Sequence, residues 1–202
     1  MIQKAQLQSL EKSLTGELFF DDLHKNIYAT DASVYRKIPL AVAYPENKKD
    51  IQQLIEFATK HQTTLIPRTA GTSLAGQCVG DGIVVDVSKH FTNVLAFDEQ
   101  AKTITVEPGI IRDDLNRFLK PLGLFFGPNT STSNRCMIGG MVGNNSSGST
   151  SIRYGVTRDK VVAIDTILSD GSLATFSEIT SEEFKQKMEL ETLEGTIYKT
   201  IY

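Results

Sequence analysis

The segment at positions 67–77 reads Pro67-Arg68-Thr69-Ala70-Gly71-Thr72-Ser73-Leu74-Ala75-Gly76-Gln77. Short β-branched runs at Leu65–Pro67 and Ile83–Val87 stand on either side of it, and such runs with glycines at their boundaries are typical of buried strands. Glycine lets the backbone approach a ligand closely and aim several N–H groups at one oxygen atom. The segment is therefore a candidate anion-binding loop between two strands.

A second stretch, Gly127–Gly155, is rich in Gly, Ser, Thr and Asn and contains Gly139-Gly140 and Gly143-Asn144-Asn145. No Asp or Glu occurs from Leu115 to Arg158, although a chain with 24 acidic residues in 202 would place about five there by composition. Residues 57–80 also lack acids. Exposed N–H groups and hydroxyls without nearby carboxylates suit an anion, so the implied ligand is a phosphate or pyrophosphate.

The alternative interpretation is that both stretches are ordinary surface loops, which segments rich in Gly, Ser and Asn commonly form. The apolar pairs Met137-Ile138 and Met141-Val142 interrupt the second stretch. Surface loops do not usually alternate glycine pairs with apolar pairs. On the residues alone, both interpretations remain open.

Three common signatures are incomplete in this sequence. Gly71 and Gly76 have the spacing of a P-loop, but Gln77-Cys78 replaces the Lys-Ser/Thr that binds phosphate and magnesium. The stretch Gly71-Thr72-Ser73-Leu74 begins like a nucleophile elbow, but Ala75 replaces its closing glycine. No expected strand is followed by the Gly-x-Gly-x-x-Gly of a Rossmann nicotinamide site. The most frequent nucleotide-binding motifs are therefore excluded.

The surrounding sequence alternates helix and strand patterns and predicts an α+β or α/β protein whose two lobes meet near residues 90–110. The expected helices are Lys49–His61, Ile111–Leu119 and Ser181–Tyr202, and the expected hairpins are Val94–Phe97 with Thr103–Glu107 and Val161–Leu168 with Ser172–Phe176. The Asp170-Gly171 pair favours a tight turn in the second hairpin.

Composition excludes several classes of protein. The chain is 40% hydrophobic and 22% charged, as globular proteins are, and its 21 basic and 24 acidic residues give a net charge of −3, which argues against a nucleic-acid partner. No apolar run approaches the roughly 20 residues of a membrane span, and the polar Met1–Gly16 is not a signal peptide. We expect a cytoplasmic protein, either free or peripheral to the inner face of the membrane. Two cysteines and three histidines predict neither a disulfide framework nor a metal site.

The two stretches together resemble the FAD-linked oxidases of the vanillyl-alcohol oxidase and p-cresol methylhydroxylase (PCMH) type. Residues 67–77 are similar to the first flavin-binding loop of that family, and residues 127–133 with 137–148 are similar to the second. Arg153-Tyr154-Gly155-Val156-Thr157-Arg158-Asp159 and the hairpin at 167–171 continue the similarity. Tyr28-Ala29-Thr30-Asp31-Ala32-Ser33 resembles the entry of the D-2-hydroxy-acid dehydrogenase branch, which includes D-lactate, glycolate and D-2-hydroxyglutarate dehydrogenases.

The resemblance implies a PCMH-type FAD-binding domain of α+β class, with the cofactor between two lobes. The implied boundaries are a leader at 1–34, the domain at 35–178 with lobes of about 35–90 and 91–178, and a helical segment at 179–202 that begins a missing downstream region. The implied FAD-binding residues are Arg68, Thr69, Ala70, Gly71, Thr72, Ser73, Leu74, Gln77, Pro128, Ser131, Thr132, Ser133, Ile138, Gly139, Gly140, Gly143, Asn144, Asn145, Ser146 and Gly148.

The resemblance also implies the chemistry, which is oxidation of a D-2-hydroxy acid with two electrons passing to the flavin. Some family members tether FAD through a histidine in the first loop, and Thr72 stands at that position here, so we expect non-covalent FAD. Family members place the substrate-binding part, the catalytic residues and any metal ligands beyond the flavin domain. We therefore assign no catalytic or metal-binding residue to this chain. The electron acceptor is unknown, and an iron–sulfur domain, which some members carry, is one candidate.

Two other functions remain open at this point. One is the flavin lobe of a reductase resembling UDP-N-acetylenolpyruvoylglucosamine reductase, and the other is a non-enzymatic nucleotide-binding module. His24, His61 and His90 lie outside the matched motifs and are expected to be ordinary surface residues. Cys78 and Cys136 are expected to pack in the interior, as free cysteines commonly do. Glu194-Gly195-Thr196-Ile197 only faintly resembles a late flavin-contacting loop, and its spacing favours a surface helix.

Overall fold

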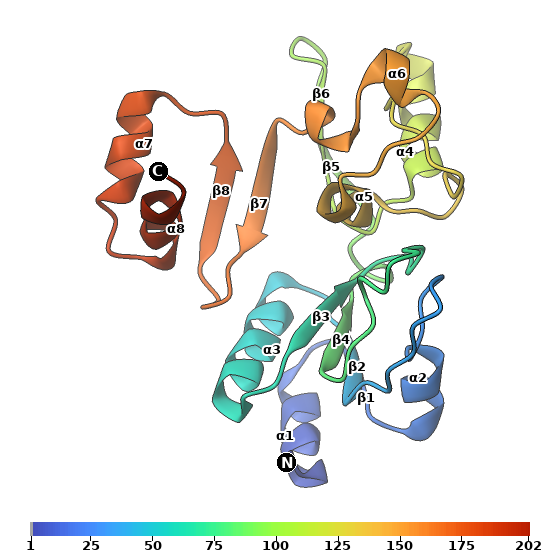
Figure 1. The fold of residues 1–202 in the computed structure, drawn as a ribbon, viewed down its shortest axis with the longest axis vertical. Helices are drawn as coiled ribbons and strands as arrows, with labels where there is room; N and C mark the ends of the chain where they lie inside the picture. The colour runs from blue at the N-terminus through green and yellow to red at the C-terminus, as the bar shows by residue number, and fades with distance from the viewer. Residues whose placement is uncertain (1) are drawn as a thin grey trace. The chain divides into compact units, whose positions relative to one another are not determined.

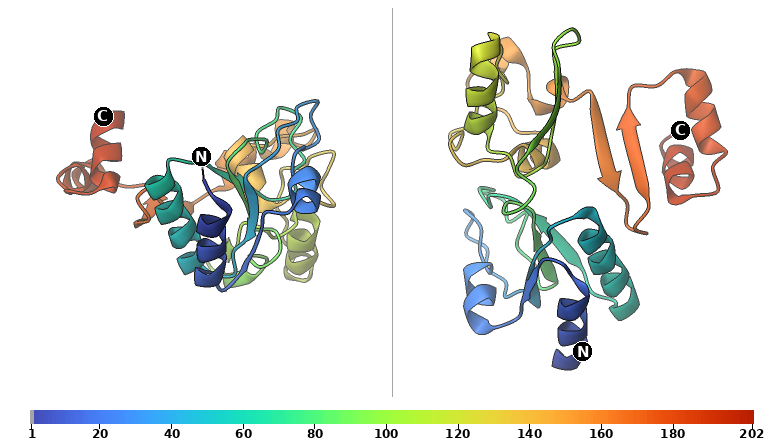
Figure 2. Two further views of the ribbon diagram at one scale, coloured as in Figure 1. Left: turned by 90° about the horizontal axis from the view of Figure 1, so that it is seen from below. Right: turned by 180° about the vertical axis from the view of Figure 1, so that it is seen from behind.

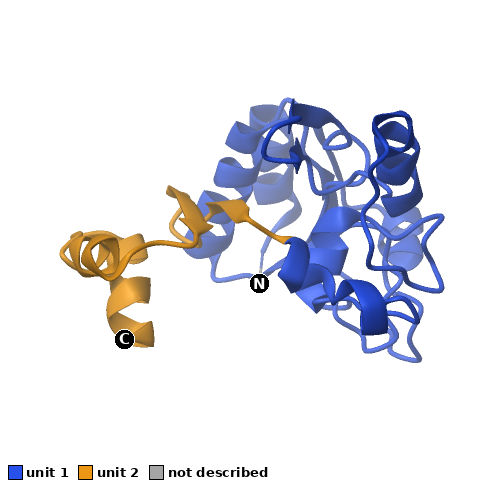
Figure 3. Cartoon of the chain, turned by 90° about the horizontal axis from the view of Figure 1, so that it is seen from above, with its two compact units in different colours: residues 1–160 blue, residues 161–202 orange. Residues whose placement is uncertain are grey.

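The computed structural model describes residues 2–202, in which helices and strands are intermixed (Figure 1). The expected α+β class is confirmed. The chain forms two compact units, unit 1, which ends at Lys160, and unit 2, Val161–Tyr202 (Figure 3). In unit 1 the elements are α1 Lys4–Ser13, β1 Glu17–Phe19, α2 Asp22–Ile27, β2 Ala41–Tyr44, α3 Lys48–His61, β3 Leu65–Arg68, β4 Ile83–Asp86, β5 Val94–Asp98, β6 Thr103–Val106, α4 Arg112–Leu119, η1 Lys120–Leu122, α5 Ile138–Asn144, α6 Ser151–Tyr154 and η2 Thr157–Lys160.

A four-stranded sheet in the order β1-β2-β4-β3 organises the first half of unit 1. Strands β2, β4 and β3 run parallel, and β1 pairs antiparallel with β2 at the edge. Side chains alternate between the two faces of a strand, so Ala41, Ala43, Ile83 and Val85 share one face. Helices α1 and α3 cover this face (Figure 2).

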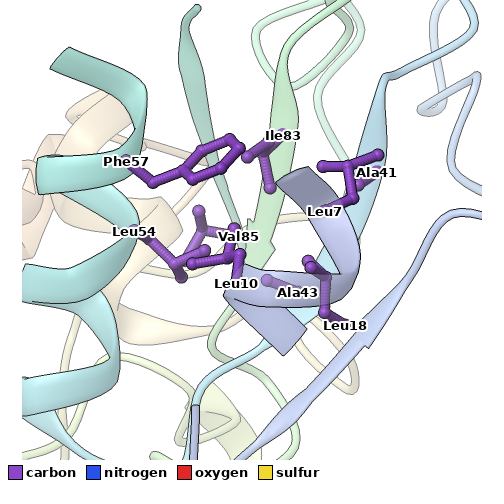
Figure 4. Close-up of a cluster of buried hydrophobic side chains, with 9 residues drawn as sticks. All are labelled: Leu7, Leu10, Leu18, Ala41, Ala43, Leu54, Phe57, Ile83 and Val85. Carbon is purple, nitrogen blue, oxygen red and sulfur yellow. The ribbon is translucent and has the colours of Figure 1, made fainter. Parts of the chain in front are cut away.

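The core under α1 and α3 is apolar and closely packed (Figure 4). Leu54 and Phe57 of α3 and Leu7 and Leu10 of α1 are buried against the strands. Asn47 caps α3 by accepting the Asp50 N–H at 3.0 Å. The carboxylate of Asp50, only 1% exposed, in turn accepts N–H groups of the segment before β1. The N-terminal residues are therefore built into the sheet, and α1 is part of the same core.

The opposite face of the sheet is covered by α2 and the residues that follow it (Figure 2). Phe19 stacks on His24 of α2, with ring centroids 3.8 Å apart. Tyr28, at the end of α2, packs edge-on against Tyr44 of β2. The segment at 67–77 begins at the carboxyl end of β3.

The second half of unit 1 has its own apolar core. The β5–β6 hairpin packs on α4, and buried Ile110, Leu115 and Leu119 meet Ile104 of β6 and Ile138 of α5. Residues 123–137 form no regular element, and α5 follows them. Two cores thus occupy unit 1, one on each side of residues 87–93.

Unit 2 is a hairpin followed by two helices, β7 Ala163–Ile167, β8 Leu173–Ser177, α7 Ser181–Met188 and α8 Leu193–Ile201. Tyr198 of α8 is buried and meets Phe184 of α7 edge-on at 5.1 Å. The expected continuous helix over 181–202 is wrong, because residues 189–192 are not helical and Thr192 caps a new helix through the Gly195 N–H. Among the described residues, no helix is long and apolar enough to cross a membrane.

The sequence predicted some elements of unit 1 and missed others. The strands and helices expected at 48–119 occur within one or two residues of their predicted bounds. The strands β1 and β2 and the helix α2 have no counterpart in the sequence prediction. Helix α5 forms inside the glycine-rich stretch, where only irregular structure was expected. The expected domain boundaries at 35 and 178 stay a prediction.

Candidate functional site

The first loop, residues 67–77, leaves β3 at the carboxyl end of the sheet. Gly71 and Gly76 adopt positive φ angles of 64° and 71°, a conformation that L side chains rarely accept. The backbone N–H groups of Ala70, Gly71, Thr72, Ser73 and Leu74 have no acceptor among the described residues. A run of N–H groups that no protein atom uses is the donor set that an anion requires.

Arg68 supports this loop from beneath. Its Nη1 donates to the Thr30 carbonyl at 2.8 Å, and its guanidinium carbon lies 4.9 Å from the centre of the Tyr28 ring. A Cβ placed on Gly71 would lie 2.5 Å from Arg68 Nη2, so the guanidinium occupies the space under the glycine. The side chain therefore reaches the leader, the residues before Tyr35, from the base of the loop.

The second region, residues 127–155, meets the first loop through α5. A Cβ placed on Gly140 would lie 2.5 Å from Thr69 Oγ1, so the absence of a side chain lets Gly140 lie against the Thr69 hydroxyl. Gln77 Nε2 donates to Asn144 Oδ1 at 2.9 Å, and Ser73 Oγ donates to Gln77 Oε1 at 2.8 Å. The structure therefore brings together the two stretches that the sequence marked separately.

Several residues of the second region serve its own folding. The N–H groups of Ile138 and Gly139 donate to the carbonyls of Ile110 and Pro108 at the start of α5. Ser133 Oγ donates to Asp113 at 3.1 Å. Pro128 is fully buried, and its carbonyl accepts Arg112 Nε at 3.1 Å. Thr132 Oγ1 lies 3.3 Å from Thr130 Oγ1, whereas the exposed Ser131 makes no hydrogen bond within the described residues.

The end of α5 is fixed by Asn145, which adopts a φ of 48°. Asn145 Oδ1 accepts the Arg158 N–H at 3.0 Å, and Ser146 Oγ accepts from Asn144 Nδ2. Gly148 lies against the Asn129 carbonyl so closely that no side chain fits there. Gly143, by contrast, is exposed with no atom near its Cβ position. Gly140 and Gly143 are thus both exposed, three residues apart on α5.

The leader contributes contacts that the sequence prediction did not include among the site residues. Ala32 N–H donates to the Gly71 carbonyl at 3.1 Å, and the Tyr35 ring lies against Gly76. Burial opposes ionisation of Asp31, but hydrogen bonds from Ser33 and Cys78 outweigh it and lower the pKa of Asp31. The sequence feature that could have indicated these contacts is Asp31-Ala32-Ser33. The Ser33 N–H donates to Asp31 Oδ1, which forms an Asx-type turn, and such a turn can fix a segment next to a glycine-rich loop.

Comparison with known proteins identifies the family. A family model described as an FAD binding domain matches residues 39–177. The chain belongs to this FAD-binding domain family. The cofactor of the domain is therefore FAD, and the sequence resemblance to the PCMH type is confirmed.

The domain is similar to curated proteins that are much longer. It is 34% identical to D-2-hydroxyglutarate dehydrogenase of Escherichia coli (strain K12) over 97% of this chain and 20% of that protein. It is 35% identical to glycolate oxidase subunit GlcD of Bacillus subtilis (strain 168) over 79% of this chain and 35% of that protein. The chain thus spans between about a fifth and a third of these relatives.

Solved structures show the same fold at low identity. Alkyldihydroxyacetonephosphate synthase superposes with a TM-score of 0.75 over 91% of this chain and 36% of that one, at 20% identity. Xylooligosaccharide oxidase from Myceliophthora thermophila C1 gives a TM-score of 0.74 over 89% of this chain and 38% of that one, at 23% identity. These likenesses support the fold of the FAD-binding domain alone.

The arrangement fits FAD on chemical grounds. The pyrophosphate of FAD carries negative charge, and the amides of Ala70–Leu74 offer N–H donors without protein partners. No Asp or Glu lies within residues 57–80 or 115–158 to repel it. Binding an anion costs little conformational entropy when the loop that carries the N–H donors is already ordered. Here the first loop is held by the hydrogen bonds of Arg68 with Thr30 and of Gly71 with Ala32.

The histidines and cysteines of the chain pack against other parts of the protein. The side chains of His24, His61 and His90 have intermediate exposure, so each lies at the surface without being fully exposed; His24 stacks on Phe19, and the His61 ring is tilted against that of Phe57. Cys78 and Cys136 are buried and unpaired, as expected, and burial raises the pKa of the Cys78 thiol. No group of His, Cys, Asp or Glu in residues 2–202 could hold a metal ion.

We expect Gly71→Ala to destabilise the FAD-binding domain by about 1–2 kcal/mol, since its φ of 64° is unfavourable for alanine and its Cβ would collide with Arg68. Urea unfolding of the unliganded protein measures the change. Gly143→Ala is the matched control, because its position is helical and open, and alanine there should raise stability by up to about 1 kcal/mol. Equal stability of the two variants would contradict the strain assigned to Gly71.

Proposed function

We propose that this chain is the FAD-binding domain of an oxidoreductase that oxidises a small D-2-hydroxy acid. The observation that carries the proposal is the free amide run of Ala70–Leu74 in a loop that contacts a second glycine-rich region, within a domain of the FAD-binding family. Relatives named D-2-hydroxyglutarate dehydrogenase, glycolate oxidase subunit GlcD and D-lactate dehydrogenase support the substrate class. These names favour the hydroxy-acid reaction over the reductase alternative.

The proposed binding set divides into donors and supports. The N–H groups of Ala70, Gly71, Thr72, Ser73 and Leu74 would donate to the pyrophosphate oxygens. Gly140 and Gly143 would let α5 approach the cofactor, and the bonded Gln77 and Asn144 would hold the two sides at a fixed separation. The remaining predicted residues, Arg68, Thr69, Pro128, Ser131, Thr132, Ser133, Ile138, Gly139, Asn145, Ser146 and Gly148, would line or support this space.

Bound FAD supplies the two-electron redox chemistry, and the work of this chain is to bind and orient it. Backbone amides around the phosphates fix the cofactor without introducing an acid or base near it. No histidine lies in the first loop or in the second region. The proton of the substrate hydroxyl and the binding of its carboxylate are therefore tasks that we assign to protein outside residues 2–202.

The proposal also covers the other protein parts with which this domain works, which we infer from the relatives. We infer that the domain works with a substrate-binding region, of the kind that fills out the longer relatives, and that its electrons pass to a separate acceptor such as an iron–sulfur domain. Binding FAD without a covalent bond follows from Thr72, whose hydroxyl replaces the imidazole of tethered members. Location in the cytoplasm, with or without peripheral attachment to the membrane, also stays a prediction.

The first test places the pyrophosphate. Leu74 is 81% exposed beside the free amides, so Leu74→Asp adds a negative charge there without disturbing the core. We expect FAD to bind about tenfold more weakly, because repulsion between like charges a few ångströms apart is worth about 1–2 kcal/mol near a surface. Titration of unliganded protein with FAD, followed by quenching of flavin fluorescence, measures the dissociation constant.

Two matched variants separate charge from shape. Leu74→Asn has nearly the same shape as the aspartate without its charge, and Leu95→Asp adds the same charge on the exposed hairpin strand β5. Both should bind FAD within about twofold of the unmodified protein. If Leu74→Asp also binds normally, the pyrophosphate does not lie at Ala70–Leu74.

The second test concerns attachment of the cofactor. Acid precipitation of the FAD-loaded protein should leave the yellow colour in the supernatant, because nothing at Thr72 can form a bond that survives unfolding. Absorbance of the supernatant and of the redissolved pellet measures the partition. Colour that stays with the pellet after washing would show a covalent flavin and contradict the role given to Thr72.

The third test concerns the substrate class. In a polypeptide that joins this domain to the substrate-binding region, anaerobic addition of D-2-hydroxyglutarate, glycolate or D-lactate should bleach the flavin absorbance, whereas NADPH should not. Stopped-flow absorbance at the flavin bands measures the reduction. Bleaching by NADPH alone would instead support the reductase, and an FAD-loaded protein that none of these compounds bleaches would overturn the hydroxy-acid proposal.

A further inference from the structure

We propose that Arg68 is a positioning residue that holds the first loop in its binding conformation by joining it to Thr30 and Tyr28, and that it does not bind the phosphates itself. The proposal rests on the proposed function, because it concerns how the amides of Ala70–Leu74 are presented to FAD. An arginine inside a phosphate-binding motif is ordinarily assigned to the phosphates. Its contacts in this structure point elsewhere.

The first argument is the direction of the guanidinium. Nη1 donates to the Thr30 carbonyl at 2.8 Å, and Nη2 lies under Gly71, 2.5 Å from where a Cβ would be. The planar group is thereby enclosed between the leader and the loop backbone. A lysine could supply the charge but not the flat surface and the directed donor together.

The second argument is that the partner of Arg68 is itself fixed. The Tyr28 ring lies 4.9 Å from the guanidinium carbon, and its hydroxyl donates to Asp86 Oδ2 at 2.6 Å and accepts from the Tyr44 hydroxyl at 2.8 Å. Asp86 is 4% exposed and sits on β4 directly beside Arg68 in the parallel register. Burial and the bond to Asp86 raise the pKa of Tyr28, so the phenol stays a donor.

The third argument is that the same leader binds the loop at further points. Ala32 N–H donates to the Gly71 carbonyl at 3.1 Å, and the Cys78 thiol lies 3.7 Å from Asp31 Oδ2. The carbonyl of Gly71 is therefore held by the leader, while the N–H groups of Ala70–Leu74 keep no protein acceptor. Arg68 adds a further link between the leader and the first loop, because its side chain contacts both Thr30 and Gly71.

The test begins with the unliganded protein, where a phosphate ligand and a positioning residue behave differently. NMR relaxation gives backbone order parameters for Ala70–Leu74, which are high in rigid segments. We expect Arg68→Gln and Arg68→Lys to lower these order parameters while those of β5 and β6 stay unchanged. A residue that acts only by binding phosphate would leave the unliganded loop as ordered as before, and that result overturns the proposal.

The second measurement is FAD affinity in a double-mutant cycle. We expect Arg68→Gln to weaken FAD binding by about tenfold, Arg68→Lys to remain more than threefold weaker than the unmodified protein, and Tyr28→Leu to weaken binding mainly when Arg68 is present. Contacting residues are coupled and independent ones are not, so the proposal would be overturned if the losses of FAD binding free energy in Arg68→Gln and Tyr28→Leu were additive. It would also be overturned if Arg68→Lys bound FAD within threefold of the unmodified protein.

Controls keep the result distinct from general charge and folding effects. Arg117→Gln removes the same charge from exposed α4 and should bind FAD within twofold. If Arg68→Gln does not fold, Arg68→Lys and Tyr28→Leu carry the same two measurements. Failure of the unmodified protein to bind FAD would count against the proposed function, whereas normal FAD binding with unaffected Arg68 variants would count against this inference alone.

Discussion

The approach of Gly140 to Thr69 is the constraint on which the site depends. A Cβ on residue 140 would lie 2.5 Å from Thr69 Oγ1, so any side chain there would force the Thr69 hydroxyl to move. Glycine in a helix costs about 1 kcal/mol relative to alanine, and α5 contains Gly139, Gly140 and Gly143. Such a helix persists because buried Met141 and the packed Ile138 anchor it in its surroundings. Close contact is gained at the expense of intrinsic helix stability.

The leader is as much part of the fold as the segment that the family model covers. That match begins at residue 39, yet Leu7, Leu10 and Leu18 belong to the core of the sheet, and β1 forms its edge. Residues 28–35 then pass beside the first loop and hold it through Thr30 and Ala32. The leader, which precedes the region matched by the family model, therefore makes contacts that hold the first loop.

The sequence predicted what local patterns encode. Helix α3 and strands β3 and β4 follow from periodicity and β-branched runs, and the lack of acids around the glycine stretches indicated an anion site before any geometry was available. Helix α5 could not be predicted, because three glycines in seven residues indicate a loop unless tertiary packing is known. The environment of Arg68 depends on Tyr28, Thr30 and Asp86, which are distant in sequence, so only the fold reveals it.

A site built from backbone donors has a consequence for specificity. In the proposed site, the amides of Ala70–Leu74 would donate to phosphate oxygens, which every flavin adenine dinucleotide carries, and such contacts would not distinguish one hydroxy acid from another. His24 and His61 pack against aromatic rings, and no histidine occurs in residues 67–77 or 127–155. Cofactor binding and substrate selection are therefore separable tasks. The domain can keep the first unchanged while a different neighbouring region supplies the second, which agrees with the variety of names among proteins that share this fold.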